Sequence, residues 1–358
     1  MNIPRRFSKV IKIRDVRIGG KYPVAIQSMA KVKTSDVEAV GRSIEALKSH
    51  GCEIVRLAVK DNEDARALKK IKGASPLPIV ADIHFSWRLA LEAIESGVDK
   101  IRLNPGNIYR KDQVASIAGA AKAHHIPIRV GINSGSLRSR LSARAGRRDC
   151  VKAMVKSAVD YIGILEKNGF YDIVVSLKAS NIPDTIAAYR KMAKRCDYPF
   201  HLGLTATGLP ASGAIKSAVA LGALLLEGIG DTIRVSLTDS PEKEVEVAKT
   251  ILEATGLRTF GGLRIISCPT CGRCEVDVAG VVKELEKKLS VVSRQLSDKP
   301  VKVAVMGCVV NGPGEASGAD IGIAFGKKEG LLFKKGKPGK KVSFSDCCDA
   351  LINEIRSL

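Results

Sequence analysis

The first two thirds of the chain alternate between short apolar runs and longer amphipathic segments. The apolar runs are rich in β-branched residues, and segments between them, such as DVEAVGRSIEALKSH, repeat apolar residues at helical spacing. Eight strands that are each followed by a helix predict a closed (β/α)8 barrel of the TIM type, and disfavour a doubly wound open sheet. The predicted strands are residues 24–29, 54–59, 78–85, 100–105, 127–133, 172–180, 200–205 and 232–238.

The pattern changes near residue 262. The rest of the chain contains a cysteine-rich turn, a helix, two strands, a hairpin and a final helix, which predicts a small α/β domain. We therefore predict a barrel domain over residues 1–262 and a second domain over residues 263–358. Within the second domain, KKEGLLFKKGKPGKK holds seven lysines around glycine and proline, and we expect a solvated hairpin there.

Polar side chains stand at the carboxyl ends of the predicted strands. Most occur as pairs two or four positions apart, so the members of a pair share one face of their strand. In a barrel this face points inward at the rim where active sites lie. The residues are Arg56, Asp82, His84, Arg102, Asn104, Arg129, Asn133, Ser176, Lys178, Arg234 and Ser236.

Five of these side chains are cations that would converge on the barrel mouth. Cations this close together require a neutralising anion. A phosphate or diphosphate suits the set, because guanidinium groups bind phosphate oxygens in pairs. The alternative is that some cations pair with rim carboxylates such as Asp82. The five are Arg56, Arg102, Arg129, Lys178 and Arg234.

The whole chain is strongly basic, with a formal net charge of +21. Such a field attracts nucleic acid, anionic membranes, phosphorylated metabolites or acidic proteins without choosing among them. We find no signal peptide and no long apolar run, and therefore expect a cytoplasmic protein with no membrane partner. Aromatic residues make up only 4% of the chain, and the cations lie at strand ends, so we expect no nucleic-acid partner.

The nine cysteines include two segments with metal-ligand spacing. An odd number of cysteines with C-x-x-C spacing indicates metal or redox chemistry rather than disulfides. Zinc would use Cys274 as a fourth sulfur ligand, whereas an iron–sulfur cluster could take three thiolates and an oxygen donor. Spacing alone leaves both open. The segments are SCPTCGRC, with Cys268, Cys271 and Cys274, and GCVVNGPGE, with Cys308; Cys52, Cys150 and Cys196 are predicted to be core residues.

Both cysteine segments resemble the signature of the 4-hydroxy-3-methylbut-2-enyl diphosphate synthases, iron–sulfur enzymes of the non-mevalonate isoprenoid pathway. The resemblance extends over the barrel, through VAIQSM, VADIHF, IRLNPGNI, RVGINSGSL, HLGLT and EGIGDTIRVSL. It implies a 4Fe-4S cluster held by Cys268, Cys271, Cys308 and Glu315. It leaves Cys274, and also Cys347 and Cys348 on the last predicted helix, as bystanders.

The resemblance also implies an oxidoreductase activity. The family opens the ring of 2-C-methyl-D-erythritol 2,4-cyclodiphosphate by reduction and dehydrates it to 4-hydroxy-3-methylbut-2-enyl diphosphate. The five cations would line the substrate site, with Asn104, Asn133 and Ser236 as hydrogen-bond donors. The family further implies a head-to-tail homodimer, and flavodoxin or ferredoxin as the electron donor, since both are acidic and match a basic surface.

The chain departs from this family at one position. After the seventh strand the family usually reads TEAG, with a glutamate as the presumed acid or base, whereas this chain reads TATG with Ala206. An alanine transfers no proton, and a positioned acid or base contributes about 100- to 10,000-fold. Asp82 and His84 then become the catalytic candidates together with Glu315, although both could instead orient the arginines.

Three alternatives to an active family member remain open. One is a diverged or inactive paralogue, because of Ala206. Another is a basic RNA-binding protein with a zinc ribbon, which would contain zinc and release RNA as salt rises. The third is an electron-transfer protein, which would not need a ring of cations in its barrel.

Overall fold

The computed structural model describes residues 3–137, 147–179, 181–205, 207–292, 300–309, 314 and 316–357. The chain divides into two compact units, Met1–Arg258 and Thr259–Leu358. Ala206, Glu315 and residues 311–313, between Cys308 and Glu315, lie outside the described residues.

The first unit is built on eight parallel strands. Their order in the sheet is β8-β7-β6-β5-β4-β3-β10-β9, and a parallel bridge between Val175 and Phe200 joins the two end strands. This closure confirms the predicted barrel. The strands are β3 (Ala25–Met29), β4 (Ile54–Val59), β5 (Ile79–Ile83), β6 (Lys100–Leu103), β7 (Ile128–Asn133), β8 (Ile173–Lys178), β9 (His201–Gly203) and β10 (Thr232–Arg234).

The last strand is shorter than its apolar run predicts. Ladder pairing of β10 stops at Arg234, and the backbone N–H of Leu237 donates instead to the Glu244 carboxylate at 3.1 Å. A carboxylate oxygen of Glu244 therefore accepts this N–H in place of a carbonyl oxygen of the neighbouring strand. The residues that follow β10 are held outside the ladder, since Thr207 donates to the Ser236 oxygen and Lys31 donates to the Leu237 oxygen at 2.7 Å.

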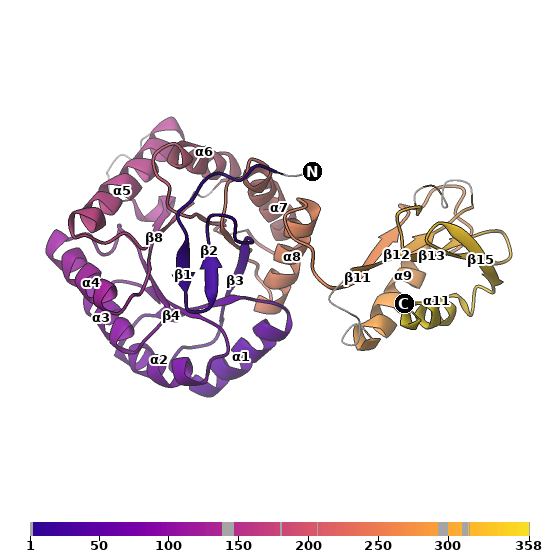
Figure 1. Ribbon diagram of the computed structural model, residues 1–358, viewed down its shortest axis with the longest axis horizontal. Coiled ribbons are helices and arrows are strands. Elements are labelled where there is room, and N and C mark those ends of the chain that lie inside the picture. The colour runs from indigo at the N-terminus through magenta and orange to yellow at the C-terminus, as the bar shows by residue number, and fades with distance from the viewer. Residues whose placement is uncertain are drawn as a thin grey trace. The chain divides into compact units, whose positions relative to one another are not determined.

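Helices follow the strands and surround them (Figure 1). The helix after β10 begins as predicted, with Ser240 as the N-cap and Pro241 in the first turn. No helix in the described part of the chain is long and apolar enough to cross a membrane. The helices of this unit are α1 (Val37–Ser49), α2 (Asn62–Ala74), α3 (Trp87–Glu95), α4 (Lys111–Ala123), the short η1 (Ser134–Ser136), α5 (Arg147–Lys167), α6 (Ile182–Ala193), α7 (Pro210–Leu226) and α8 (Pro241–Ala254).

A small hairpin plugs the amino end of the barrel. It consists of β1 (Ile11–Ile13) and β2 (Val16–Ile18), and Figure 1 shows it across the middle of the ring. Its isoleucines are buried against Ala25, Ile54 and Val80 near the starts of barrel strands. One end of the barrel is thus closed by apolar packing, and the polar carboxyl ends are left for the site.

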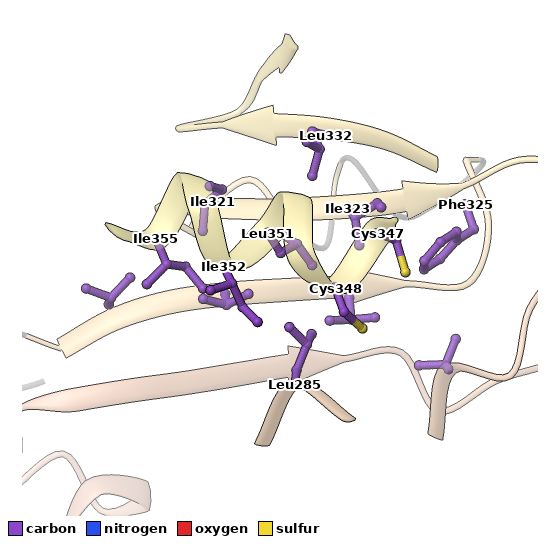
Figure 2. Close-up of a cluster of buried hydrophobic side chains, with 14 residues drawn as sticks. Leu285, Ile321, Ile323, Phe325, Leu332, Cys347, Cys348, Leu351, Ile352 and Ile355 are labelled. Atoms are coloured by element: carbon purple, nitrogen blue, oxygen red, sulfur yellow. The ribbon is translucent and has the colours of Figure 1, made fainter. Parts of the chain in front are cut away.

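The second unit is a five-stranded sheet with two helices packed on its main core. The order is β11-β12-β13-β14-β15, with parallel pairing up to β13 and antiparallel pairing after it. Helix α11 turns Cys347, Cys348 and Leu351 toward the sheet, where they are buried (Figure 2). The elements are β11 (Gly262–Ser267), α9 (Val278–Val292), β12 (Pro300–Met306), β13 (Ile321–Phe325), β14 (Gly330–Lys334), β15 (Lys337–Val342) and α11 (Cys347–Arg356).

The lysine-rich segment forms the expected hairpin. Strands β14 and β15 are joined at Lys335 and Gly336, whose φ angles are 50° and 75°. Two successive positive φ values are typical of the tight hairpin turn that matches the twist of the strands. Strand β15 forms the edge of the sheet, and most of its residues are exposed.

Candidate functional site

The carboxyl ends of the barrel strands surround a cavity of about 280 Å³. Most of the polar residues predicted at the strand ends line it, together with Leu204 and Thr205. His84 and Asn104 are the two that do not. The predicted residues in the lining are Arg56, Asp82, Arg102, Arg129, Asn133, Ser176, Lys178, Arg234 and Ser236.

Asp82 is the one carboxylate among the described residues that line this cavity. It accepts a hydrogen bond from Arg102 at 3.1 Å, and Arg56 Nε lies 3.7 Å away. Burial alone would raise the pKa of Asp82, but Arg56 and Arg102 outweigh it and hold the pKa at about 2. The carboxyl group is therefore ionised at neutral pH. It can orient the two arginines, but it is a poor proton donor.

A second carboxylate holds Arg234 from outside the cavity. Glu244 of α8 is 1% exposed, accepts from Arg234 at 3.3 Å and from Ser28 at 3.1 Å, and forms an ion pair with Lys31 at 2.9 Å. Three of the five cations thus have a carboxylate partner, Arg56 and Arg102 in Asp82 and Arg234 in Glu244, as the alternative interpretation of the cation set predicted for some of them. This role of Glu244 could not be predicted, because Glu244 lies among other acidic residues in PEKEVE.

Arg129 and Lys178 form no ion pair with a described residue, although the charge of Asp82 is near enough to oppose the fall in the pKa of Arg129. Arg129 is 1% exposed, and its Nε and Nη1 make no hydrogen bond. Burial, and then Arg56 and Arg102, lower the pKa of Arg129 well below its usual value; burial and the neighbouring arginines do the same to the pKa of Lys178. Buried cations without counter-charges destabilise a fold. A bound anion would supply what the described residues do not.

A further polar layer lies in the barrel interior, and sequence reasoning missed it. Lys100 is fully buried with no partner for its Nζ, and the buried His201 uses Nδ1 on Thr232 at 2.8 Å while Nε2 has no partner. Burial and nearby cations lower the pKa of His201 well below its usual value, so the ring is neutral. The available signal was spacing, since Lys100 precedes Arg102 by two positions on the same strand face.

Asn104 and His84 occupy the loops beyond the strands. Asn104 donates to Ser136 Oγ at 3.0 Å and accepts from the N–H of Gly106 at 3.0 Å, so its amide fixes the loops after β6 and β7. Gly106 is required there, since a Cβ would lie 2.1 Å from the Ser136 carbonyl oxygen. His84 is half-buried after β5, and its backbone oxygen accepts from Asn107 at 2.8 Å.

Removing the charge of Asp82 should destabilise the barrel. We expect Asp82→Asn to lower the free energy of unfolding by about 3 kcal/mol at pH 7, because two buried arginines lose their shared counter-charge. Because the folded pKa lies below the unfolded value, this contribution is present above about pH 4 and disappears as pH falls toward about 2. Urea unfolding between pH 3 and 7 measures both effects.

An exposed ion pair supplies the control for that experiment. Glu246→Gln removes a carboxylate that lies 2.7 Å from Lys243 on the surface of α8, and it should change the unfolding free energy by less than about 1 kcal/mol. Equal effects of the two substitutions would contradict the role assigned to Asp82.

In the second unit, the two cysteine segments follow the carboxyl ends of neighbouring parallel strands, and we call this end of the sheet the cysteine edge. Cys268 follows β11 and Cys308 follows β12, and these strands are parallel neighbours. The N–H of Gly307 donates to Cys268 Sγ at 3.2 Å, and Glu275 donates from its N–H to the Gly307 oxygen at 3.0 Å. Backbone contacts therefore tie the two segments together.

The thiols differ in their surroundings. A Cβ on Gly307 would lie 2.3 Å from Cys274 Sγ and 3.3 Å from Cys268 Sγ, so these two sulfurs border the same backbone. Cys271 is exposed, and Cys308 is half-buried. Among the residues that the structure describes, no three histidine, cysteine or acidic side chains surround a common metal position. Thiols from two joined segments, one of them already accepting a backbone N–H, are nevertheless a donor set that suits an iron–sulfur cluster.

The cysteines away from this edge behave as predicted only in part. Cys52 is buried in the barrel, whereas Cys150 and Cys196 are half-buried. Burial raises the pKa of Cys52 to about 12, so this thiol stays protonated and inert.

Adding one methyl group at Gly307 should disturb the cysteine edge and the adjoining side chain of Val278, whose Cγ2 would lie 2.9 Å from the new Cβ. In Gly307→Ala the new Cβ would overlap Cys274 Sγ, and we expect about 10- to 100-fold weaker retention of iron after anaerobic reconstitution. Iron per chain and visible absorption measure this. Gly318→Ala is the control, because nothing lies within 4 Å of its Cβ. Unchanged iron content in Gly307→Ala would contradict the assignment of this edge.

Comparison with known proteins identifies both units. Residues 8–249 match the family model of the GcpE TIM-barrel domain, and residues 264–357 match that of the GcpE protein C-terminal domain. The chain belongs to the GcpE family. This membership confirms the resemblance drawn from the cysteine segments and the barrel motifs.

Relatives in the GcpE family are similar over nearly their full length. Three proteins named 4-hydroxy-3-methylbut-2-en-1-yl diphosphate synthase (flavodoxin) illustrate this. The one from Caldicellulosiruptor saccharolyticus is 52% identical over 98% of this chain and 99% of its own. Those from Thermodesulfovibrio yellowstonii and Caldanaerobacter subterraneus subsp. tengcongensis are 51% and 49% identical, each over 99% of this chain and 99% and 98% of their own.

Solved structures share the barrel with this GcpE chain. Dihydropteroate synthases from Coxiella burnetii, in complex with pteroic acid, and from Stenotrophomonas maltophilia superpose with TM-scores of 0.52 and 0.53. Each match covers 70% of this chain and 100% of the other, at 15% and 13% identity. At such low identity the likeness shows the fold alone.

Proposed function

We propose that this protein is a 4-hydroxy-3-methylbut-2-en-1-yl diphosphate synthase that receives electrons from flavodoxin. It would convert 2-C-methyl-D-erythritol 2,4-cyclodiphosphate into 4-hydroxy-3-methylbut-2-enyl diphosphate. The observation that carries the proposal is a cavity whose described lining holds five cations and one carboxylate, in which two nitrogens of Arg129 make no hydrogen bond and Lys178 forms no ion pair with a described residue. Family membership then selects a cyclic diphosphate from among the anions that such a cavity could bind.

The substrate diphosphate would complete the charge balance of the cavity. Arg129 and Lys178 would bind its oxygens without breaking an ion pair with a described residue. Arg56 and Arg102 would bind it while keeping their contacts with Asp82. Asn133, Ser176 and Ser236 line the same cavity and would donate to the remaining oxygens. Arg234 would contribute charge from its place beside Glu244.

The reaction consumes two electrons and two protons for each substrate molecule. The ring carbon–oxygen bond to the diphosphate breaks, and a hydroxyl group leaves as water. A 4Fe-4S cluster held by Cys268, Cys271, Cys308 and Glu315 would supply the electrons one at a time. Glu315, a harder ligand than a thiolate, is the one suited to exchange. Asp82, with a pKa of about 2, is ionised at neutral pH, so we propose His84 or water as the proton donor.

Anaerobic turnover tests this function. Reconstituted protein, reduced methyl viologen and the cyclic diphosphate are mixed, and dye oxidation is followed together with product. We expect substrate-dependent oxidation and formation of hydroxymethylbutenyl diphosphate. Zinc in place of iron, with RNA binding that weakens as salt rises, would instead support the zinc-ribbon alternative. The homodimer and the cytoplasmic location stay predictions.

A further inference from the structure

The segment that follows β10 carries a side chain of the cavity without the support of a strand ladder. Pairing of β10 with β9 ends at Arg234, and Ser236, two residues later, lines the cavity. We call residues 235–239 the Ser236 segment. Because a hydroxyl group donates only over a short distance, the contacts that fix this segment decide whether Ser236 can reach a bound anion.

The loop after β9 holds one side of the Ser236 segment. Thr207 donates from its hydroxyl group to the Ser236 oxygen, and the N–H of Thr238 donates to the Gly208 oxygen at 3.0 Å. In the sheet, β10 lies between β9 and β3. On the other side of the segment, the neighbouring loop is therefore the one that follows β3.

Lys31, in the loop after β3, holds the Ser236 segment from that second side. Its Nζ donates to the Leu237 oxygen at 2.7 Å and to the Asp239 oxygen, and it lies 2.9 Å from the Glu244 carboxylate. An ammonium group has three N–H donors, so these three acceptors use all of them. Lys31 therefore has no donor left for a substrate.

Glu244 and Lys31 together bind both backbone groups of Leu237. The Leu237 N–H donates to Glu244 at 3.1 Å, while the Leu237 oxygen accepts from Lys31. Glu244 is 1% exposed and belongs to α8, so the ion pair rests on a buried side chain of a regular helix. One ion pair thus fixes the backbone of the residue next to Ser236.

We propose that Lys31 is a positioning residue of the diphosphate site, and that it acts through the Ser236 segment. It holds the backbone of residues 237–239 so that the Ser236 hydroxyl group can donate to a diphosphate oxygen. This rests on the proposed function. A displacement of about 1 Å can cost up to about 100-fold in such a site, so a contact outside the cavity can change binding inside it.

Lys33 supplies a matched control in the same loop. It is exposed, and its side chain makes no hydrogen bond or ion pair with the described part of the chain. Lys31→Met and Lys33→Met therefore remove the same charge two positions apart, and only the first removes contacts with the Ser236 segment. The Lys31 side chain is 34% exposed, so we expect both variants to fold.

The test measures binding of inorganic pyrophosphate to the full-length protein by calorimetry. We expect Kd to rise about 10-fold in Lys31→Met, and less than about 2-fold in Lys33→Met, because salt screens an exposed charge. Lys31→Arg keeps a charged group with several donors and should stay within about 3-fold of the parent protein. The KM for the cyclic diphosphate, with reduced methyl viologen as donor, should follow the same order.

A double-mutant cycle shows whether Lys31 acts through Ser236. Ser236→Ala removes the hydroxyl group that Lys31 positions. In that background Lys31→Met should raise Kd by less than about 3-fold, because the positioned group is absent. A rise of about 10-fold in both backgrounds would show that the two residues act independently, and it would overturn the proposal.

Two further results would overturn the positioning role alone. They are an unchanged Kd in Lys31→Met, and equal losses in Lys31→Met and Lys33→Met, which would indicate the general basic field. A parent protein that binds pyrophosphate but does not turn over the cyclic diphosphate would lose the proposed function and keep this role. A parent protein that binds no pyrophosphate would contradict both.

Discussion

Replacing Ala206 with glutamate should raise viologen-driven turnover by about 100-fold or more. Loss of the hydroxyl group as water requires a proton. Asp82 is buried, bound to Arg102 and held at a pKa of about 2, so it is almost never protonated at neutral pH. A glutamate at position 206, which the resemblance to the family's TEAG motif implies, would add a carboxyl group that could supply that proton.

Ala206→Gln separates proton transfer from side-chain size. Glutamine fills the same space but donates no proton to a leaving hydroxyl group, so we expect turnover to stay at the parental level. The pH profile of Ala206→Glu should also gain a new acidic limb. If glutamate and glutamine gave the same turnover as alanine, another group would supply the proton. His84→Gln would then be the next variant to measure.

Arg129→Met should raise the stability of the protein and lower its catalytic activity. Arg129 is 1% exposed with two unpartnered nitrogens, so an apolar side chain of similar length should raise the free energy of unfolding by about 1–3 kcal/mol. The same change removes a guanidinium from the diphosphate site, and we expect kcat/KM to fall by about 100-fold. Urea unfolding and viologen-driven kinetics measure the two effects.

Lys100→Met is the matched control for this variant. Lys100 is equally buried and unpartnered, but it does not line the cavity. It should therefore give the gain in stability with little change in kcat/KM. A loss of stability in Arg129→Met would show that the guanidinium is satisfied in the protein alone, and the argument for an anion site would fail.

The barrel and the mouth of its cavity could be predicted from the sequence, because both follow from strand periodicity. A period of two decides which side chains face inward, and it predicted nine of the residues that line the cavity, among them Arg56 and Ser236. Periodicity says nothing about partners. It could not show that Glu244, from a helix, accepts a hydrogen bond from Arg234, or that the Asn104 amide donates to Ser136.

The polar residues deeper in the barrel could not be predicted from the sequence for a related reason. Lys100 and His201 sit near the starts of strands, where an inward polar residue is unexpected, and neither completes a motif. The β1–β2 hairpin was not predicted, because strands of three residues are too short to show a clear period. The cysteine segments were recognisable from spacing. Only the register of β11 with β12 shows how they come to share an edge.

The ratio of electrons to product tests the central claim most directly. Reduced methyl viologen is supplied anaerobically to the reconstituted protein with the cyclic diphosphate, and oxidised dye and hydroxymethylbutenyl diphosphate are both counted. Because each viologen radical carries one electron, we predict two radicals oxidised for each product molecule, and none without substrate. Dye oxidation without this product, or product formed without dye oxidation, would contradict the proposed function.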